Sequence, residues 1–327
     1  MASPLLAKEL LCSDMLLVDG LGRAGKQLVS KLVSNFNRVE CFQYSASLEQ
    51  LFILSFLGHL DRKPAVAYLR LIADEMVYNR MIGRNLNTRP GDASSILKAN
   101  DYDDYIRRSV DQEGDAAVAS FNAARRLPCF MTHHVLAHFD LFVDAYPAVK
   151  LVHAVRHPVD LIHSWHHRDW GIRIGNDPRA FALAIELDGQ PAPWWGEETA
   201  HLYPTLSPVD RVVIDVLRLQ ELCDDAHADL PPARQKQVHY ISYEHLFIDA
   251  GSEMDRIARF FDTEPCKDFD LVLARERVPR PAAVSLESRQ KKFEELRAIA
   301  SEEAIARISE ASRNYEKQWD LPPVEAV

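Results

Sequence analysis

The chain has 327 residues, of which 47% are hydrophobic and 26% charged, an ordinary balance for a globular protein. Its net charge of −10 argues against non-specific binding to nucleic acid, because such binders need a basic face. No apolar stretch approaches the ~20 residues that span a bilayer, no secretion signal is visible, and the five cysteines are dispersed, so we expect a cytoplasmic protein with reduced thiols.

Predicted strands and helices alternate along the whole chain. Short apolar runs predict strands over residues 15–18, 38–43, 128–132, 149–155 and 238–242. Apolar residues at helical spacing predict helices over 27–36, 48–83 with a break near Pro64, 101–127, 136–146, 158–165, 208–228, 252–261 and 293–319. Residues 84–100, 171–208 and 262–288 show neither pattern and predict loops or irregular structure.

This alternation predicts an α/β fold, a three-layer sandwich in which helices cover both faces of a central parallel sheet. No internal repeat or linker interrupts the pattern, so we expect a single domain over residues 1–327. Helical or loop insertions are expected at about 44–127 and 171–208. Such insertions lie over the strand ends, where sheets of this kind bind ligands.

The first strand leads into a glycine-rich turn in the stretch LLVDGLGRAGKQLVSKLV (residues 16–33). Gly20 to Lys26 fits the pattern G-x-x-x-x-G-K, in which glycines let backbone amides turn toward an anion at the start of a helix. The next residue is Gln27, where a Ser or Thr hydroxyl would bind Mg²⁺ beside a nucleoside triphosphate. The turn therefore predicts an anion site more strongly than a site for Mg-ATP, and a plain strand-to-helix turn is the alternative.

A second motif follows the strand over 149–155, in VKLVHAVRHPVDLIHSWHHR. The strand ends in Arg156, and Ser164 lies on the helix that Pro158 opens. A kinase with a phosphate-binding turn usually has an aspartate here that helps to hold Mg²⁺. Arg156 and Ser164 instead offer a guanidinium fork and a hydroxyl to a second phosphate.

Together these motifs resemble the sulfotransferase family, whose members transfer a sulfuryl group from 3′-phosphoadenosine-5′-phosphosulfate (PAPS) and release adenosine 3′,5′-bisphosphate (PAP). Arg156 to Ser164 matches the family's motif R-x-P-x-D-x-x-x-S for the 3′-phosphate, and VHYISYEHLF is similar to its strand-Y-E-x-L segment. The resemblance implies a P-loop-like turn that binds the phosphosulfate, a place for Tyr243 near the adenine, and no metal. The implied nucleotide-binding residues are Gly22, Arg23, Ala24, Gly25, Lys26, Gln27, Arg156, Ser164 and Tyr243.

The same resemblance implies which residues are catalytic. Arg23 stands where the family has a catalytic lysine or arginine, and Lys26 would join it in stabilising the leaving phosphate. The turn lacks the family's two hydroxyl residues, since Lys26 and Gln27 take their places. The family's C-terminal R-K-G element is not visible, and Arg280 or Arg289 could substitute for it.

A base must take the acceptor's proton. The stretch MTHHVLAH resembles the segment in which cytosolic family members carry a histidine base, so His133 is the first candidate and His134 the second. Carbohydrate-type members use a glutamate on an early helix, and Asp74 or Glu75 could play that part. The acceptor itself is left open as a hydroxyl or amine of a sugar, lipid or small molecule, as is the formation of a homo-oligomer.

Two other functions stay open. A kinase of the phosphate-loop class would need a carboxylate at a strand end to bind Mg²⁺, and Asp215 is the one candidate for it in the sequence. A non-catalytic member that keeps the fold and binds a nucleotide or protein is the other.

Two clusters outside these motifs allow more than one interpretation. The histidine pairs 163/167 and 134/138 have zinc-compatible spacing but no accompanying third ligand in the sequence, so we expect no metal. Trp194 and Trp195 could stack on an acceptor or fill the core.

Overall fold

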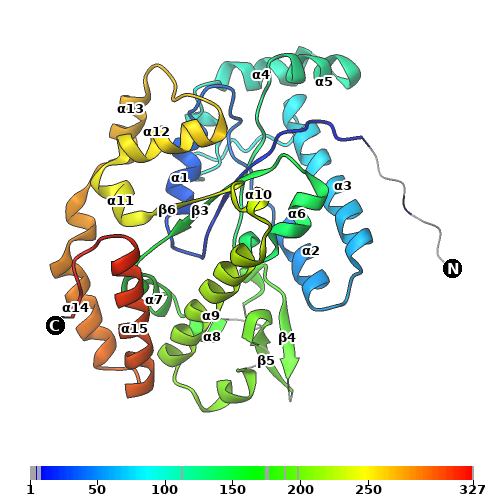
Figure 1. The fold of residues 1–327 in the computed structure, drawn as a ribbon. Helices are drawn as coiled ribbons and strands as arrows, with labels where there is room; N and C mark the ends of the chain where they lie inside the picture. The colour runs from blue at the N-terminus through cyan, green and yellow to red at the C-terminus, as the bar shows by residue number, and fades with distance from the viewer. Residues whose placement is uncertain are drawn as a thin grey trace.

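A four-stranded parallel sheet forms the centre of the computed structural model, which describes residue 5 and residues 9–111, 113–173, 177–187, 189–196 and 199–325 (Figure 1). The strand order is β2 (Cys129–Met131), β1 (Leu16–Asp19), β3 (Lys150–Val155) and β6 (Val238–Ser242). Each neighbouring pair is parallel. The predicted parallel α/β sheet is therefore confirmed.

Helices cover both faces of this sheet, because successive strand side chains point to opposite sides. Leu16 and Val18 enter one core, while Leu17 enters the other. The first core is closed by α1 (Lys26–Val33), α12 (Ala250–Phe261) and α13 (Phe269–Glu276). The second is closed by α2 (Ala46–Phe56), α3 (Arg62–Met81), α6 (Phe139–Ala145), α7 (Pro158–His166), α9 (Pro208–Asp229), α14 (Leu286–Arg297) and α15 (Glu302–Gln318). The predicted three-layer arrangement is thus confirmed.

The remaining elements are short or lie in the two insertions. The helices are α4 (Tyr102–Asp111), α5 (Gly114–Ala123), α8 (Trp170–Arg173), α10 (Pro232–Gln235) and α11 (Tyr243–Ile248). The 3₁₀ turns are η1 (Ile96–Lys98), η2 (Val135–His138), η3 (Pro178–Ala180), η4 (Trp194–Gly196), η5 (Ala200–Thr205) and η6 (Pro281–Val284). Strands β4 (Ala184–Leu187) and β5 (Gln190–Pro193) form a separate antiparallel hairpin. Among the described helices, none combines the length and apolarity needed to cross a membrane.

Three predictions of local structure are wrong, the first being the irregular structure expected over 171–208, which contains the β4–β5 hairpin. Residues 38–43 do not form a strand, since Arg38 has a left-handed φ of 67° and only isolated bridges follow at Val39 and Gln43. The predicted connection over 262–288 contains α13, which buries Phe269 and Val272 one turn apart. Residue 112 of the helical prediction and residues 174–176, 188 and 197–198 of the second insertion lie outside the described residues.

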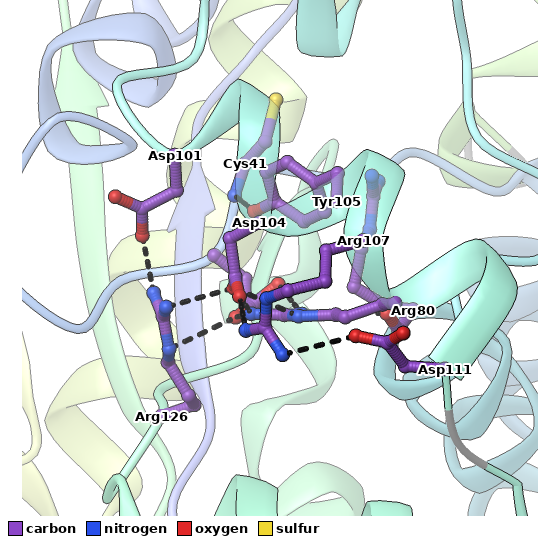
Figure 2. Close-up of polar contacts among 10 residues, drawn as sticks. Cys41, Arg80, Asp101, Asp104, Tyr105, Arg107, Asp111 and Arg126 are labelled. Atoms are coloured by element: carbon purple, nitrogen blue, oxygen red, sulfur yellow. Dashed lines mark hydrogen bonds and ion pairs between the residues drawn. The ribbon is translucent and has the colours of Figure 1, made fainter.

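A buried ion network holds α4 against the segment that follows α1. The side chain of Glu40 is 1% exposed, and Arg108 of α4 binds its two carboxylate oxygens at 2.9 and 3.0 Å. Figure 2 shows the neighbouring side chains that extend this network, namely Asp101, Asp104, Arg107, Asp111 and Arg126. Glu40 therefore anchors part of the first insertion to the segment that follows α1.

Replacing Glu40 by alanine should lower the free energy of unfolding by about 3–5 kcal/mol, because removing one partner of a buried pair leaves the other charge poorly compensated. Urea unfolding of the variant measures this loss. The control is Arg62→Ala, whose pairs with Asp140 and Asp144 are about half exposed and are worth up to about 1 kcal/mol. Equal losses in the two variants would contradict the anchoring role of Glu40.

Candidate active site

The predicted site residues meet at the carboxyl edge of the sheet, because all four strands are parallel and end on the same side. Gly20 follows β1, His133 lies two residues after β2, and Arg156 follows β3. Tyr243 follows β6 and begins α11. The chain thus brings together four segments that lie far apart in the sequence.

The turn between β1 and α1 is closely packed. Gly25 has a φ of 105° immediately before α1, and a Cβ atom added there would lie 2.4 Å from Cδ2 of Tyr243. A Cβ atom on Gly22 would lie 2.4 Å from the ring of Trp170. The Gly22 carbonyl also accepts a hydrogen bond of 2.6 Å from Trp165 Nε1. These contacts explain why glycines occupy the two positions.

Arg23, Ser164, Arg156 and Tyr243 form one contact chain at the mouth of this turn. Arg23 Nε donates a hydrogen bond to Ser164 Oγ at 3.3 Å. Arg156 Nη1 donates to the Arg23 carbonyl at 3.1 Å, and its guanidinium carbon lies 4.4 Å from the centre of the Tyr243 ring. The structure therefore brings together the turn and the second motif, as their sequences led us to expect.

Positive charge at this mouth is only partly compensated. Burial, followed by repulsion from Arg168 and Arg156, lowers the pKa of Arg23. Asp160 lies 3.9 Å from Arg156 but binds Arg289 more closely, at 3.2 Å. The Nε atom of Arg156 is buried and has no hydrogen-bond partner among the residues that the structure describes. These features fit an anionic ligand that would complete the hydrogen bonds of Arg156 and screen the arginines.

The side chains of Lys26 and Gln27 point in different directions, that of Lys26 into the protein and that of Gln27 into solvent. The Lys26 ammonium donates hydrogen bonds to the carbonyls of Gly20 and Leu21, at 2.8 and 3.1 Å, and the residue is 4% exposed. Burial lowers the pKa of Lys26 to about 8. The Lys26 ammonium thus stabilises the backbone of the turn from its buried side. The prediction instead had this ammonium contact a leaving phosphate. Gln27 is exposed in the first turn of α1.

Asp19 fixes the segment after β2 on which the predicted histidines lie. Its carboxylate accepts hydrogen bonds from Thr132 Oγ1 at 2.8 Å and from the amides of Val135 and Leu136. His153 Nδ1 adds a contact of 2.9 Å. Burial alone would raise the pKa of Asp19, but these hydrogen bonds, led by that of His153, lower it well below its usual range. Asp19 is therefore an ionised structural anchor.

His133 pairs with Glu49, a residue of α2 that the sequence analysis missed. Both the backbone N–H of His133 and its Nδ1 atom contact Glu49 Oε1, the latter at 3.1 Å. Burial raises the pKa of Glu49 to about 8, while burial and then the Lys26 charge lower the pKa of His133 well below its usual value. His133 is thus neutral at pH 7.

A sequence signal for Glu49 does exist. Its neighbours Leu48, Leu51 and Phe52 are apolar, and helical spacing places Glu49 on the same face as Phe52. A carboxylate on the buried face of a helix is costly unless it has a partner, which makes it a candidate for function.

His134 lies beside the two tryptophans rather than beside Glu49. Its φ is 47°, and its ring centre is 6.1 Å from that of Trp194 and 5.8 Å from that of Trp195. The tryptophans are only 1% and 8% exposed. Of the two interpretations of this pair, core filling is the one that the structure supports.

The alternative bases Asp74 and Glu75 lie elsewhere. Asp74 accepts a hydrogen bond of 2.9 Å from Tyr146, which precedes β3 and so lies toward the amino ends of the strands. Glu75 is exposed on α3. The structure thus places Asp74 toward the amino ends of the strands, away from the edge at which the other site residues meet, and gives no support to either residue as the base.

The two arginines that could substitute for the family's C-terminal R-K-G element lie in different environments. Arg289 is 1% exposed and binds Asp160, with Glu244 at 3.7 Å, so it is engaged inside the core, and its role in binding a ligand stays a prediction. Arg280 is exposed, and its guanidinium lies 4.9 Å from the centre of the Phe247 ring on the helix that Tyr243 begins.

Asp215 does not have the position that a magnesium ligand of a kinase needs. It lies within α9, is 1% exposed, and accepts a hydrogen bond of 3.0 Å from Trp195 Nε1. Burial raises its pKa to about 8, so the carboxyl group holds a proton at pH 7. This residue is a neutral core group.

Asp215→Asn should therefore stabilise the protein, and by more as the pH rises from 5 to 8. The folded state retains the Asp215 proton up to about pH 8, whereas the unfolded chain releases it near pH 4, so wild-type stability falls with pH in this window. The difference should grow by up to about 1.4 kcal/mol per pH unit in chemical denaturation. Asp225→Asn, on the exposed side of the same helix, is the control. A difference that does not change with pH would contradict this assignment.

Comparisons with known proteins identify the family of the chain. The family model described as "Sulfotransferase domain" matches residues 42–269, which include Arg156, Ser164 and Tyr243 and begin after the glycine turn. No curated protein matches the chain.

Solved structures of low sequence identity also resemble the chain. The sulfotransferase domain of the Synechococcus PCC 7002 olefin synthase has a TM-score of 0.48 at 12% identity, covering 98% of this chain and 100% of that domain. Sulfotransferase STF9 from Mycobacterium avium has a TM-score of 0.44 at 12% identity, covering 95% of this chain and 78% of that one. The assignment rests on the family model, which spans more than half of the 327 residues. The chain belongs to the sulfotransferase domain family.

Proposed function

We propose that the chain transfers a sulfuryl group from PAPS to a hydroxyl or amine of a small-molecule, lipid or carbohydrate acceptor. The observation that carries this proposal is the cationic mouth formed by Arg23, Arg156 and Ser164, in which the buried Nε of Arg156 has no partner within the described part of the chain. A second phosphate on the ligand would supply that partner. PAPS, which has a phosphate at the ribose 3′ position, brings both this group and the activated sulfate.

Each element of the mouth has a role in this proposal. The Arg156 fork and the Ser164 hydroxyl bind the 3′-phosphate, and Tyr243 packs beside the adenosine. The backbone amides around Gly25 and the guanidinium of Arg23 face the 5′ side, where they neutralise charge as the nucleotide leaves. Lys26 holds the turn in shape through its two carbonyl contacts, so Arg23 supplies the charge.

The acceptor proton is taken by His133. Glu49 Oε1 accepts a hydrogen bond from the backbone N–H of His133 and lies 3.1 Å from its Nδ1 atom; in the tautomer that donates Nδ1–H to Glu49, the lone pair is on Nε2. The His133 side chain is 25% exposed and that of Glu49 only 6%, so His133 is the member of the pair that an acceptor reaches. Glu49 is the positioning residue.

A non-catalytic nucleotide-binding role has one specific observation in its favour. The turn has no hydroxyl side chain, and the Lys26 ammonium is engaged by its own backbone. The kinase alternative has less support, because Asp215 is a neutral core residue. A cytoplasmic location and a homo-oligomer stay predictions.

Thermal unfolding with PAP, ADP or Mg-ATP, together with a turnover assay with PAPS over a panel of acceptors, separates these functions. A ligand that binds only the folded state raises its stability by about RT ln(1 + [L]/Kd). We expect stabilisation by PAP well above that by ADP, and release of PAP from PAPS with at least one acceptor. PAP binding without turnover would support the non-catalytic role, and stabilisation by Mg-ATP alone would support a kinase.

A further inference from the structure

Three potential metal ligands converge at the end of α7. His163 lies in the last turn of this helix, His167 follows one turn later, and Glu295 comes from α14, 132 residues beyond His163. The Nε2 atoms of the two histidines are 3.0 Å apart, and His163 Nε2 lies 2.7 Å from Glu295 Oε2. One ligand atom from each of the three side chains lies within 4.8 Å of the others.

Hydrogen bonds alone do not satisfy the three side chains well. A neutral imidazole nitrogen carries either one proton or one lone pair, yet His163 Nε2 faces two partners. Without an ion, one proton on His163 Nε2 must be shared between Glu295 Oε2 and the Nε2 lone pair of His167, which weakens both hydrogen bonds. A cation between the three groups takes a lone pair from each of them and needs no such sharing.

The distances are close to those that a zinc-type ion requires. Bonds of about 2.0–2.1 Å in a tetrahedral site place ligand atoms about 3.3 Å apart. The separations of 2.7 and 3.0 Å need only small side-chain movements to reach that value. His163 is partly buried, while His167 and Glu295 are exposed, so an ion can enter from solvent.

We propose that His163, His167 and Glu295 form a site for one divalent transition-metal ion of the zinc class, with solvent in the fourth position. Two imidazoles and one carboxylate are a donor set that suits zinc and cobalt better than magnesium or calcium. This site reverses the expectation of no metal, which rested on the absence of a third ligand near the histidine pair in the sequence. Glu295 supplies that ligand from a distant helix.

The ion would fasten α14 to α7. These helices are already joined by Asp160 of α7, which binds Arg289 and Lys292 of α14. Lys292 is thereby engaged by Asp160 beside the proposed site. Ser164 of the candidate active site is adjacent to His163, so the ion would stabilise the helix that carries this hydroxyl. The proposal stands independently of the sulfotransferase activity.

Cobalt(II) titration of the metal-free protein, followed by visible absorption, tests this site without an activity assay. We expect one ion per chain with the strong absorption of tetrahedral cobalt, displaced by an equivalent of zinc, and a rise in melting temperature with either metal. His163→Ala and His167→Ala should each weaken binding by at least about tenfold. His166→Ala, which removes a neighbouring imidazole outside the cluster, is the matched control and should bind cobalt as the wild type does.

Glu295→Gln keeps a hydrogen-bonding partner for His163 but removes the charged ligand. This variant should keep the fold, as seen by circular dichroism, and lose tetrahedral cobalt absorption. Failure of the wild-type protein to bind cobalt, or binding that survives in all three ligand variants, would overturn the proposal. An equal loss of binding in His166→Ala would also overturn it.

Discussion

Replacing Arg156 by alanine is expected to abolish the protein's preference for PAP over AMP, two nucleotides that differ only in the 3′-phosphate. Hydrogen bonds between charged groups contribute about 1.5–3 kcal/mol, so the variant should lose about ten- to hundred-fold in affinity for PAP. Affinity for AMP should change little, because the 5′ side of the ligand faces the turn and Arg23. Isothermal titration with both nucleotides measures the difference.

Two matched variants separate the roles of charge and geometry. Arg156→Lys keeps the positive charge but loses the guanidinium fork, and it should recover part of the preference. Arg259→Ala removes an exposed arginine of α12 and should bind both nucleotides as the wild type does. If Arg156→Ala still prefers PAP as strongly as the wild type, the assignment of the 3′-phosphate site is wrong.

Replacing His133 by alanine is expected to lower kcat by about 10²–10⁴-fold while the affinity for PAP stays the same, since general-base catalysis contributes about this much. Burial lowers the pKa of His133 well below its usual value, so the base stays neutral in mild acid. The wild-type rate should therefore persist as the pH falls from 7 toward 6, where an ordinary histidine would become protonated. Steady-state kinetics over this range measure both effects.

Glu49 variants distinguish positioning from a merely structural role. Glu49→Gln keeps an oxygen that can accept the His133 Nδ1–H bond, whereas Glu49→Ala removes it. The glutamine variant should therefore recover part of the kcat that the alanine variant loses, with KM for PAPS unchanged in both. Equal kcat values for both variants and the wild type would contradict the pairing of Glu49 with His133 in catalysis.

The parts of the site that lie in continuous motifs could be predicted from the sequence. Arg156 and Ser164 share one strand–helix unit, and the pattern of that unit fixes their relative positions. The turn from Gly20 to Gly25 is similarly local, since a left-handed φ at Gly25 and the following helix define it. The alternation of predicted strands and helices was also enough to predict the three layers of the fold, because the periodicity of apolar residues shows which face of each element is buried.

The parts that depend on contacts between distant segments could not be predicted. Glu49 reaches His133 across 84 residues, and nothing near either of them in the sequence indicates the other. The pattern G-x-x-x-x-G-K gives the position of Lys26 but not the direction of its ammonium, which burial turns toward the carbonyls of Gly20 and Leu21. The apolar run over 38–43 predicted a strand, but the left-handed residue Arg38 breaks it.

The most direct test of the account is a crystal structure of the protein with PAP. We expect the 3′-phosphate to contact the Arg156 guanidinium and the Ser164 hydroxyl, and the 5′-phosphate to lie on the amides of the turn that ends at Gly25. Density for the nucleotide at any other place, or with its 3′-phosphate in solvent, would contradict the assignment of this cationic mouth as the donor site.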